Sequence, residues 1–358
     1  MSRISQKFHI LHNQKTHRLT HIPVLILMPH SACNCRCVMC DIWKANGTKT
    51  ELAAETLRRH VEAFRKLGVE WIILSGGEPL LHRNLWALCS MLKAIGVRLT
   101  LLSSGLLLKQ HAKAIARWVD EVIVSLDGSP EIHDRIRNVP RGFARMQEGI
   151  AALQQICPDL RICARSVVQK QNYFDLPGII RTAKELKLHQ LSFLAVDVTS
   201  SAFNRPGLWP EPRRREVMLS EDEVEHFAQI LESVIDRFAD DFASGFIAES
   251  PEKLRRMVRY FRALLGLAPF PPVRCNAPWV SAVLEADGRV RPCFFHPPYG
   301  TLDASTSFSG LLNGPGAIAF RKHLQVASDP TCQTCTCSLY IDPLQPIRRL
   351  RRRQNAVP

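Results

Sequence analysis

Short apolar runs alternate with amphipathic stretches from residue 24 to residue 197. The runs of strand length are residues 24–28, 71–74, 99–102, 121–124, 161–168 and 191–196. The stretches with helical spacing of apolar positions are residues 50–67, 85–95, 109–118 and 176–186. Strands that alternate with helices of about 10 to 15 residues are typical of βαβ units with right-handed crossovers. The pattern therefore predicts an α/β fold with six parallel strands, and such a fold places its chemistry at the carboxyl ends of the strands.

The pattern changes after residue 197. A loop rich in serine and proline opens the next segment, and two amphipathic helices are predicted at about 221–239 and 251–266. From residue 271 onward, cysteine, glycine and proline replace the helical periodicity, which predicts a small domain held together by its ligands. The predicted divisions are an N-terminal extension (1–23), a core (24–197), a connector (198–272), a cysteine-rich domain (273–340) and a basic tail (341–358).

Composition is that of an ordinary globular protein. The chain has 358 residues, enough for about two domains, with 46% hydrophobic and 22% charged residues. No apolar run reaches the ~18 residues of a membrane span, and the start of the chain lacks the apolar centre of a signal peptide. We therefore expect a cytoplasmic protein without a transmembrane segment. In such a chain, clustered cysteines bind metal more often than they form disulfides.

The formal net charge of +14 indicates a basic surface. Five of the excess charges come from the tail, on Arg348, Arg349, Arg351, Arg352 and Arg353. The remainder is spread along the chain and favours an anionic partner such as a phosphorylated substrate, an acidic peptide or a membrane face. The basic tail keeps nucleic acid among the candidate partners. A solvated basic surface without a specific partner explains the same charge.

Four of the twelve cysteines lie within residues 33–40, directly after the first predicted strand. Cys33, Cys37 and Cys40 have the spacing Cys-x3-Cys-x2-Cys, which lets three thiolates converge on one iron–sulfur cluster. Three ligands for a four-iron cluster leave one iron open to a substrate or cofactor. Buried thiols and a zinc site are the alternatives, and a closed zinc site needs a fourth ligand such as Cys35 or His30.

In this motif the chain resembles the radical S-adenosylmethionine (radical SAM) superfamily. The resemblance implies a (β/α)6 partial TIM barrel, a 4Fe–4S cluster on the three cysteines, and S-adenosylmethionine bound at the open iron. Cys35 departs from the family pattern, in which an apolar or aromatic residue is usual. Met39 stands where many members carry an aromatic residue that packs on the adenine.

The motif Ser75-Gly76-Gly77-Glu78-Pro79 ends the second predicted strand. Two glycines let the backbone approach a ligand closely, and a glutamate can accept a hydrogen bond from a cationic amine. Alone, such a motif indicates only a tight turn. In its place after the cysteine loop it resembles the family segment that binds the methionine amino group, which implies a cofactor-binding role for all five residues.

A third motif surrounds the end of the fourth predicted strand. The hydroxyl of Ser125 and the carboxylate of Asp127 can hold a ribose, and Arg137 or Arg165 can clamp a carboxylate. The similarity here is to family members that carry a second cluster domain. A turn with surface salt bridges is the alternative.

The C-terminal cysteines form a second set. Twelve residues separate Cys275 from Gly288, four more precede Cys293, and Cys332 and Cys335 form a Cys-x2-Cys pair. The Asp-Gly turn at that glycine predicts a hairpin that carries the first two cysteines, and the pair can complete a four-thiolate site.

This second set resembles the auxiliary-cluster domain of radical enzymes. The match is to the shorter form, called twitch, which holds one 4Fe–4S cluster as in the aminocyclitol dehydrogenase of antibiotic biosynthesis; the longer form, SPASM, has cysteines for a second. A zinc ribbon is the alternative, because four thiolates also suit zinc. Cys337 is surplus: it can replace Cys335, donate hydrogen to a substrate radical, or have no role. The remaining cysteines, Cys89, Cys157 and Cys163, have apolar neighbours and are predicted core residues.

The resemblance covers residues 24–337 and implies a reaction. An electron from the reduced cluster, supplied by a reductant such as flavodoxin or ferredoxin, splits S-adenosylmethionine, and the 5′-deoxyadenosyl radical abstracts a substrate hydrogen. We predict oxidation of a small polar or sugar-like molecule, with the auxiliary cluster as electron acceptor. The alternatives are a peptide maturase that forms a thioether or carbon–carbon crosslink, and a non-catalytic iron–sulfur electron carrier.

Overall fold

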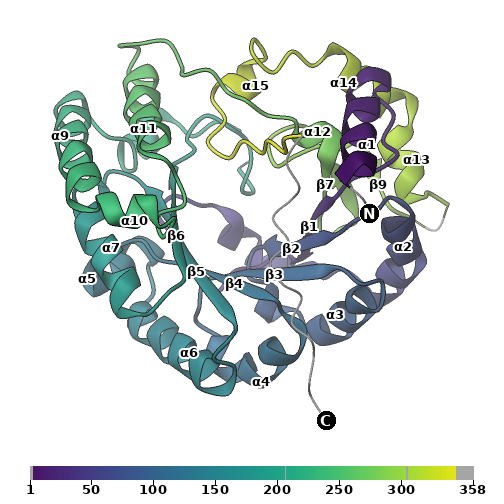
Figure 1. The fold of residues 1–358 in the computed structure, drawn as a ribbon, viewed down its shortest axis with the longest axis horizontal. Coiled ribbons are helices and arrows are strands. Elements are labelled where there is room, and N and C mark those ends of the chain that lie inside the picture. The colour runs from purple at the N-terminus through teal and green to yellow at the C-terminus, as the bar shows by residue number, and fades with distance from the viewer. Residues whose placement is uncertain (1–2, 206, 304, 344–358) are drawn as a thin grey trace.

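The strands form one curved sheet (Figure 1). The computed structural model describes residues 3–205, 207–303 and 305–343, and within them nine strands pair in the order β6-β5-β4-β3-β2-β1-β7-β8-β9. Their bounds are β1 Val24–His30, β2 Trp71–Gly76, β3 Arg98–Ser103, β4 Glu121–Ser125, β5 Arg161–Val168, β6 Gln190–Ala195, β7 Ser281–Leu284, β8 Arg289–Arg291 and β9 Gly300–Thr301. Neighbours from β6 to β7 are parallel, whereas β8 and β9 are antiparallel. The carboxyl ends of seven strands therefore meet at one rim.

Helices line the outer side of this sheet (Figure 1). Those that connect the first six strands are α2 Ala54–Lys66, α3 Leu85–Ala94, α4 Leu108–Trp118, α5 Pro130–Arg137, α6 Gly142–Ile156 and α7 Leu176–Glu185. The others are α1 Arg3–Thr16, α8 Glu211–Arg215, α9 Glu221–Arg237, α10 Ala239–Ala243, α11 Pro251–Leu264, α12 Ala277–Val280, α13 Phe308–Asn313, α14 Pro315–His323 and α15 Pro330–Gln333. Three short 3₁₀ helices are η1 Ile42–Thr48, η2 Pro79–Leu81 and η3 Tyr173–Asp175.

The six predicted strands all form at their predicted places, and the predicted fold class is confirmed. Strand β1 is buried along nearly its whole length, as expected for a central parallel strand that is covered on both faces. In helix α4, Leu108, Ala112 and Ile115 are buried at the i, i+4, i+7 spacing from which the helix was predicted.

Several segments differ from the prediction. Helices α13 and α14 occupy part of the chain for which little helix is expected, and helices α5 and α6 are not predicted individually. The Asp-Gly turn forms between β7 and β8, with Gly288 at φ +85°, but Cys275 precedes α12 and is therefore not on the hairpin. Strand β7 pairs in parallel with β1 and so joins the C-terminal segment to the main sheet.

No helix of the described residues is both long and apolar enough to cross a membrane. The five tail arginines that contribute to the predicted basic surface lie outside the described residues.

Candidate functional site

Residues 33–40, which we call the cysteine loop, follow β1 at the rim formed by the carboxyl ends of the strands. The backbone of α5 supports it, because Arg36 N donates to Arg137 O at 3.1 Å and Val38 N donates to Ile136 O at 3.0 Å. Beside it lies a cavity of about 270 Å³. All four cysteines of the loop line this cavity, which we call the cysteine cavity: Cys33, Cys35, Cys37 and Cys40. The three predicted ligands thus face one space.

Cys35 lies among these thiols rather than apart from them. Hydrogen bonding to Cys33 and Cys37, together with burial, raises the pKa of Cys35. The hydrogen bond from Cys35 lowers the pKa of Cys37 to about 6, whereas burial raises the pKa of Cys40 to about 12. His30, the other fourth ligand considered for zinc, points elsewhere: it pairs with Glu51 at 3.5 Å and does not line the cysteine cavity.

The motif of residues 75–79, which we call the Gly-Gly turn, packs directly against the start of the cysteine loop. Gly77 N donates to His30 O at 3.2 Å, and Glu78 N donates to Ala32 O at 2.8 Å. A Cβ atom on Gly77 would lie 1.9 Å from Ala32 O, and Gly76 has φ +116°. These positions therefore require glycine for backbone packing, and Ser75, Gly76 and Gly77 line the cysteine cavity.

The carboxylate of Glu78, which is predicted to contact the cofactor, lies in the protein interior. Its carboxylate accepts hydrogen bonds from Ser103 Oγ at 3.0 Å, Ser104 N at 2.8 Å and Leu80 N at 3.2 Å, and the residue is 0% exposed. Burial raises the pKa of this carboxyl group. Pro79, which begins η2, is also buried and does not line the cavity. The sequence missed Ser103 and Ser104, which do line it, because serine after a strand carries no distinct signal.

Asp127, which is predicted to hold a ribose, also lies in the protein interior. It is 0% exposed and does not line the cysteine cavity. One of its oxygens accepts from Val167 N at 2.9 Å and the other pairs with Arg137, so the carboxylate is not available to a ribose. Arg137 also donates to Cys37 Sγ at 3.5 Å, which makes it a poor candidate for clamping a carboxylate.

Ser125 and Arg165 keep their predicted places. Both line the cysteine cavity: Ser125 is the last residue of β4, and Arg165 lies within β5. Arg165 Nε donates to Ser192 Oγ at 3.3 Å, and no acidic partner of Arg165 occurs among the described residues. Its guanidinium therefore remains able to bind a carboxylate.

A loop after β6 binds the cysteine loop through side-chain interactions that the sequence did not suggest. Arg205 pairs with Asp197 at 2.9 Å and its guanidinium stacks over the ring of Trp209 at 3.9 Å. Trp209 Nε1 donates to Asp41 Oδ2 at 2.7 Å, and Arg213 donates to Val38 O. This loop thus contacts the cysteine loop at Val38 and the chain directly after it at Asp41.

The C-terminal cysteines lie near enough to one another to interact electrostatically. Burial and the proximity of other groups, cysteines among them, raise the pKa values of Cys275, Cys293, Cys332 and Cys335. Cys337 neighbours this set and, with Thr336, also lines the cysteine cavity. The second cysteine set therefore abuts the first.

Two residues near Cys332 were missed by the sequence reasoning. His296 Nε2 lies 3.4 Å from Cys332 Sγ and 3.7 Å from Asp329 Oδ1, and Asp329 caps α15 by accepting from Cys332 N at 2.9 Å. These three side chains could also hold a single metal ion. Of the predicted core cysteines, Cys89 and Cys163 are buried and Cys157 is half-buried.

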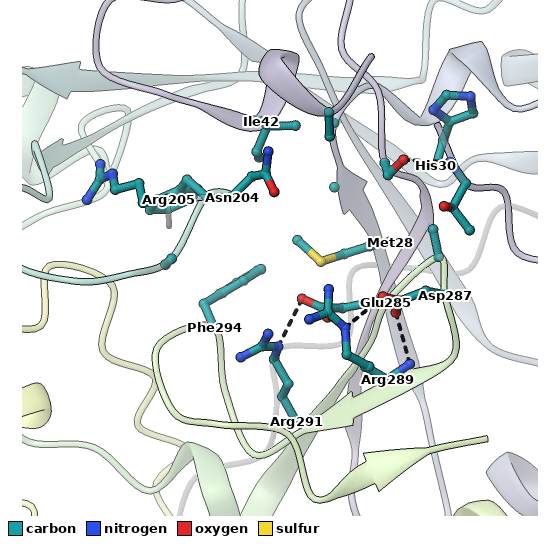
Figure 2. A pocket seen from close by; sticks show the side chains of 18 of the residues that line it. Met28, His30, Ile42, Asn204, Arg205, Glu285, Asp287, Arg289, Arg291 and Phe294 are labelled. Atoms are coloured by element: carbon teal, nitrogen blue, oxygen red, sulfur yellow. Dashed lines mark hydrogen bonds and ion pairs between the residues drawn. The ribbon is translucent and has the colours of Figure 1, made fainter. Parts of the chain in front are cut away.

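A second, larger cavity has a volume of about 430 Å³, and Figure 2 shows side chains that line it. Charged residues of the β7–β8 hairpin form one wall, where Glu285 pairs with Arg289 and with Arg291, each at 2.9 Å. The two cavities share lining residues, among them Met28 and Phe294, and are therefore adjacent.

Comparison with known proteins gives matches over both cysteine regions. The family model of the radical SAM superfamily matches residues 27–183, and that of SPASM, an iron–sulfur cluster-binding domain, matches residues 275–336. The AdoMet-dependent heme synthase of Methanosarcina barkeri is 30% identical over 173 residues, which are 47% of this chain and 49% of the relative. The PqqA peptide cyclase of Ruegeria pomeroyi is 27% identical over 254 residues, or 69% of this chain and 61% of the relative. Each match thus spans less than two thirds of the relative.

Solved structures share the fold. Streptococcus suis SuiB bound to S-adenosylmethionine superposes with a TM-score of 0.61 at 14% identity, covering 93% of this chain and 76% of SuiB. The two matched domains confirm the predicted cofactors, 4Fe–4S clusters and S-adenosylmethionine. The residues present fit them: thiols surround one cavity, and Arg165 lines this cavity without an acidic partner among the described residues.

Proposed function

The chain belongs to the radical S-adenosylmethionine superfamily, and on this premise we propose that it cleaves S-adenosylmethionine at the cysteine loop and oxidises a small polar substrate. When bound and reduced, the 4Fe–4S cluster supplies the electron that splits S-adenosylmethionine, and the resulting 5′-deoxyadenosyl radical takes a hydrogen atom from the substrate. The observation that carries the proposal is the cysteine cavity, which is lined by the cysteine loop, by the Gly-Gly turn and by Cys337, the neighbour of the second cysteine set.

In this proposal Cys33, Cys37 and Cys40 hold the cluster. The backbone of Gly76 and Gly77 faces the methionine amino group, and the guanidinium of Arg165 binds the methionine carboxylate as a fork. Ser125, which lines the cavity, donates a hydrogen bond to the ribose in this proposal. The apolar wall of the cavity, which includes Val167 and Val196, excludes water from the reacting atoms.

The proximity of the second cysteine set supports oxidation. Cys337 and Thr336 line the same cavity as the cysteine loop, so an auxiliary cluster on Cys275, Cys293, Cys332 and Cys335 would lie beside the substrate. An acceptor in that place can take the second electron that an alcohol gives up when it becomes a ketone.

A peptide substrate is the second candidate, and the larger cavity favours it. This cavity is adjacent to the cysteine cavity and has room for the residues next to the one that reacts. Its wall carries both acidic and basic groups, which suits the mixed polarity of a peptide. Relatives with peptide substrates in their names include the PqqA peptide cyclase.

The test is an anaerobic assay of the reconstituted, dithionite-reduced protein with S-adenosylmethionine. We expect 5′-deoxyadenosine and methionine, and a drop to background for Arg165→Ala at low S-adenosylmethionine that higher concentrations partly restore. A protein that holds iron at the cysteine loop but forms no 5′-deoxyadenosine would overturn the proposal. Deuterated sugars or cyclitols and deuterated peptides then separate the two candidates, since the substrate transfers its deuterium to 5′-deoxyadenosine.

A further inference from the structure

A buried guanidinium lies on one sulfur of the cysteine loop. Arg137 Nη1 donates to Cys37 Sγ at 3.5 Å, while Arg137 Nη2 pairs with Asp127 Oδ2. The side chain of Arg137 is 11% exposed and that of Asp127 is 0% exposed. Because little water screens them, these charges act on the sulfur more strongly than surface charges do.

The position of this guanidinium is fixed from both sides. Asp127 is held by Val167 N, which donates to its other carboxylate oxygen at 2.9 Å. The loop itself is tied to the same helix, since Arg36 N donates to Arg137 O at 3.1 Å. The distance between the arginine and the sulfur therefore depends on backbone contacts and on a paired carboxylate, not on a free side chain.

The arrangement gives the two charges opposite effects on reduction. Reduction of a cluster by an external one-electron donor adds one negative charge, which a cation beside a ligand sulfur stabilises. The arginine donates to the sulfur directly and should raise the reduction potential, whereas the carboxylate behind it should lower the potential. The arginine is the nearer charge, so the net effect of the pair is to raise it.

We propose that the Arg137–Asp127 pair sets the reduction potential of the cluster at the cysteine loop, an inference that rests on the proposed function of this loop. Arg137 is thus a positioning residue that acts through Cys37. It leaves the binding of the methionine carboxylate to Arg165, whose guanidinium has no acidic partner in the described chain.

The experiment is a redox titration of the reconstituted full chain followed by electron paramagnetic resonance. The cluster of the cysteine loop is identified as the signal that changes when S-adenosylmethionine is added. For Arg137→Gln we expect reduction to become about tenfold less favourable, which for one electron corresponds to about 59 mV toward negative potential. For Asp127→Asn we expect a shift of the opposite sign.

Arg161→Gln is the matched control. This arginine also pairs with a mostly buried acid, Glu121 at 3.0 Å, but the two residues begin β5 and β4 and so lie at the opposite end of the sheet from the loop. In Arg161→Gln, the reduction potential of the cluster at the cysteine loop should equal that of the wild type. Shifts of the same sign in Arg137→Gln and Asp127→Asn, or no shift in either, would overturn the inference.

Iron content separates the possible failures. If Arg137→Gln does not hold iron, two other variants test the inference. Asp127→Asn must raise the reduction potential of the cluster. Arg137→Lys keeps the positive charge and must therefore have a reduction potential close to that of the wild type. A wild-type protein without any signal that responds to S-adenosylmethionine contradicts the proposed function of the loop instead.

Discussion

The two cysteine sets of this protein are built in opposite ways. The first lies on eight consecutive residues after β1, so its three candidate ligands are brought together by their spacing alone. The second is gathered from segments before α12, after β8 and around α15, which meet only when the chain is folded. A local set needs the fold to supply its surroundings, whereas a dispersed set needs the fold to supply the ligands themselves.

The surroundings of the two sets differ accordingly. The cysteine loop is held by the backbone of α5, by the Gly-Gly turn and by the loop that carries Arg205 and Trp209. In the C-terminal set, the buried side chain of Asn276 joins the segment after Cys275 to the segment after Cys337, because its amide group exchanges hydrogen bonds with Ile341 at 2.8 and 2.9 Å. We therefore expect the second cysteine set to lose its metal more easily than the first.

The largest effect is expected from removing the local set. The triple variant Cys33→Ala, Cys37→Ala, Cys40→Ala should lose all cleavage of S-adenosylmethionine and keep about four irons per chain, those of the auxiliary cluster. Iron and sulfide analysis with a product assay measures both. Zinc in place of the retained iron would show that the second set is a zinc site.

Gly77→Ala should disturb the first set without removing a ligand. The new Cβ would lie 1.9 Å from Ala32 O, and forcing it in should cost roughly 1–3 kcal/mol and displace the start of the cysteine loop. We expect at least a tenfold loss of S-adenosylmethionine cleavage. Gly47→Ala is the control, since nothing lies within 4 Å of a Cβ there. Equal activity of the two variants would mean that the turn and the loop do not depend on each other.

Asn276→Ala should open the second set while sparing the first. It leaves the N–H and C=O of Ile341 without their partners in a buried place, at a cost of about 1–3 kcal/mol for each such group. We expect partial loss of metal from the C-terminal set, measured as metal content, and a lower melting temperature. The exposed Asn84, whose side chain makes no capping hydrogen bond, provides the control Asn84→Ala. Loss of metal from the cysteine loop instead would reverse the comparison.

The smallest effect is expected from His296→Ala. If His296 only donates a hydrogen bond to Cys332, the iron of the second set should remain and its reduction potential should move slightly negative. His323→Ala, on the exposed side of α14, should change neither quantity. Release of one metal ion per chain from the His296 variant would instead assign a mononuclear site to His296, Asp329 and Cys332.

The accuracy of the prediction from sequence follows the range of the interactions involved. The strands and the Cys-x3-Cys-x2-Cys motif rest on neighbours in the chain, and the strands form where they were predicted. The surroundings of Glu78 and Asp127 could not be predicted, because a carboxylate beside a ligand cavity and one buried behind it have the same local sequence. Only the folded chain shows that Ser103 and Ser104 donate hydrogen bonds to one carboxylate and that Arg137 forms an ion pair with the other.

The sequence by itself determined the parallel α/β core, the thiols of the cysteine loop and the Gly-Gly turn, because periodicity and spacing over a few residues encode them. Tertiary structure alone decided that β7 extends the sheet beside β1, that Cys337 reaches the cysteine cavity, and that Arg137 rests on Cys37. Each of these contacts joins residues far apart in the chain. Their partners are selected by packing and by the need to pair buried charges, which no local pattern records.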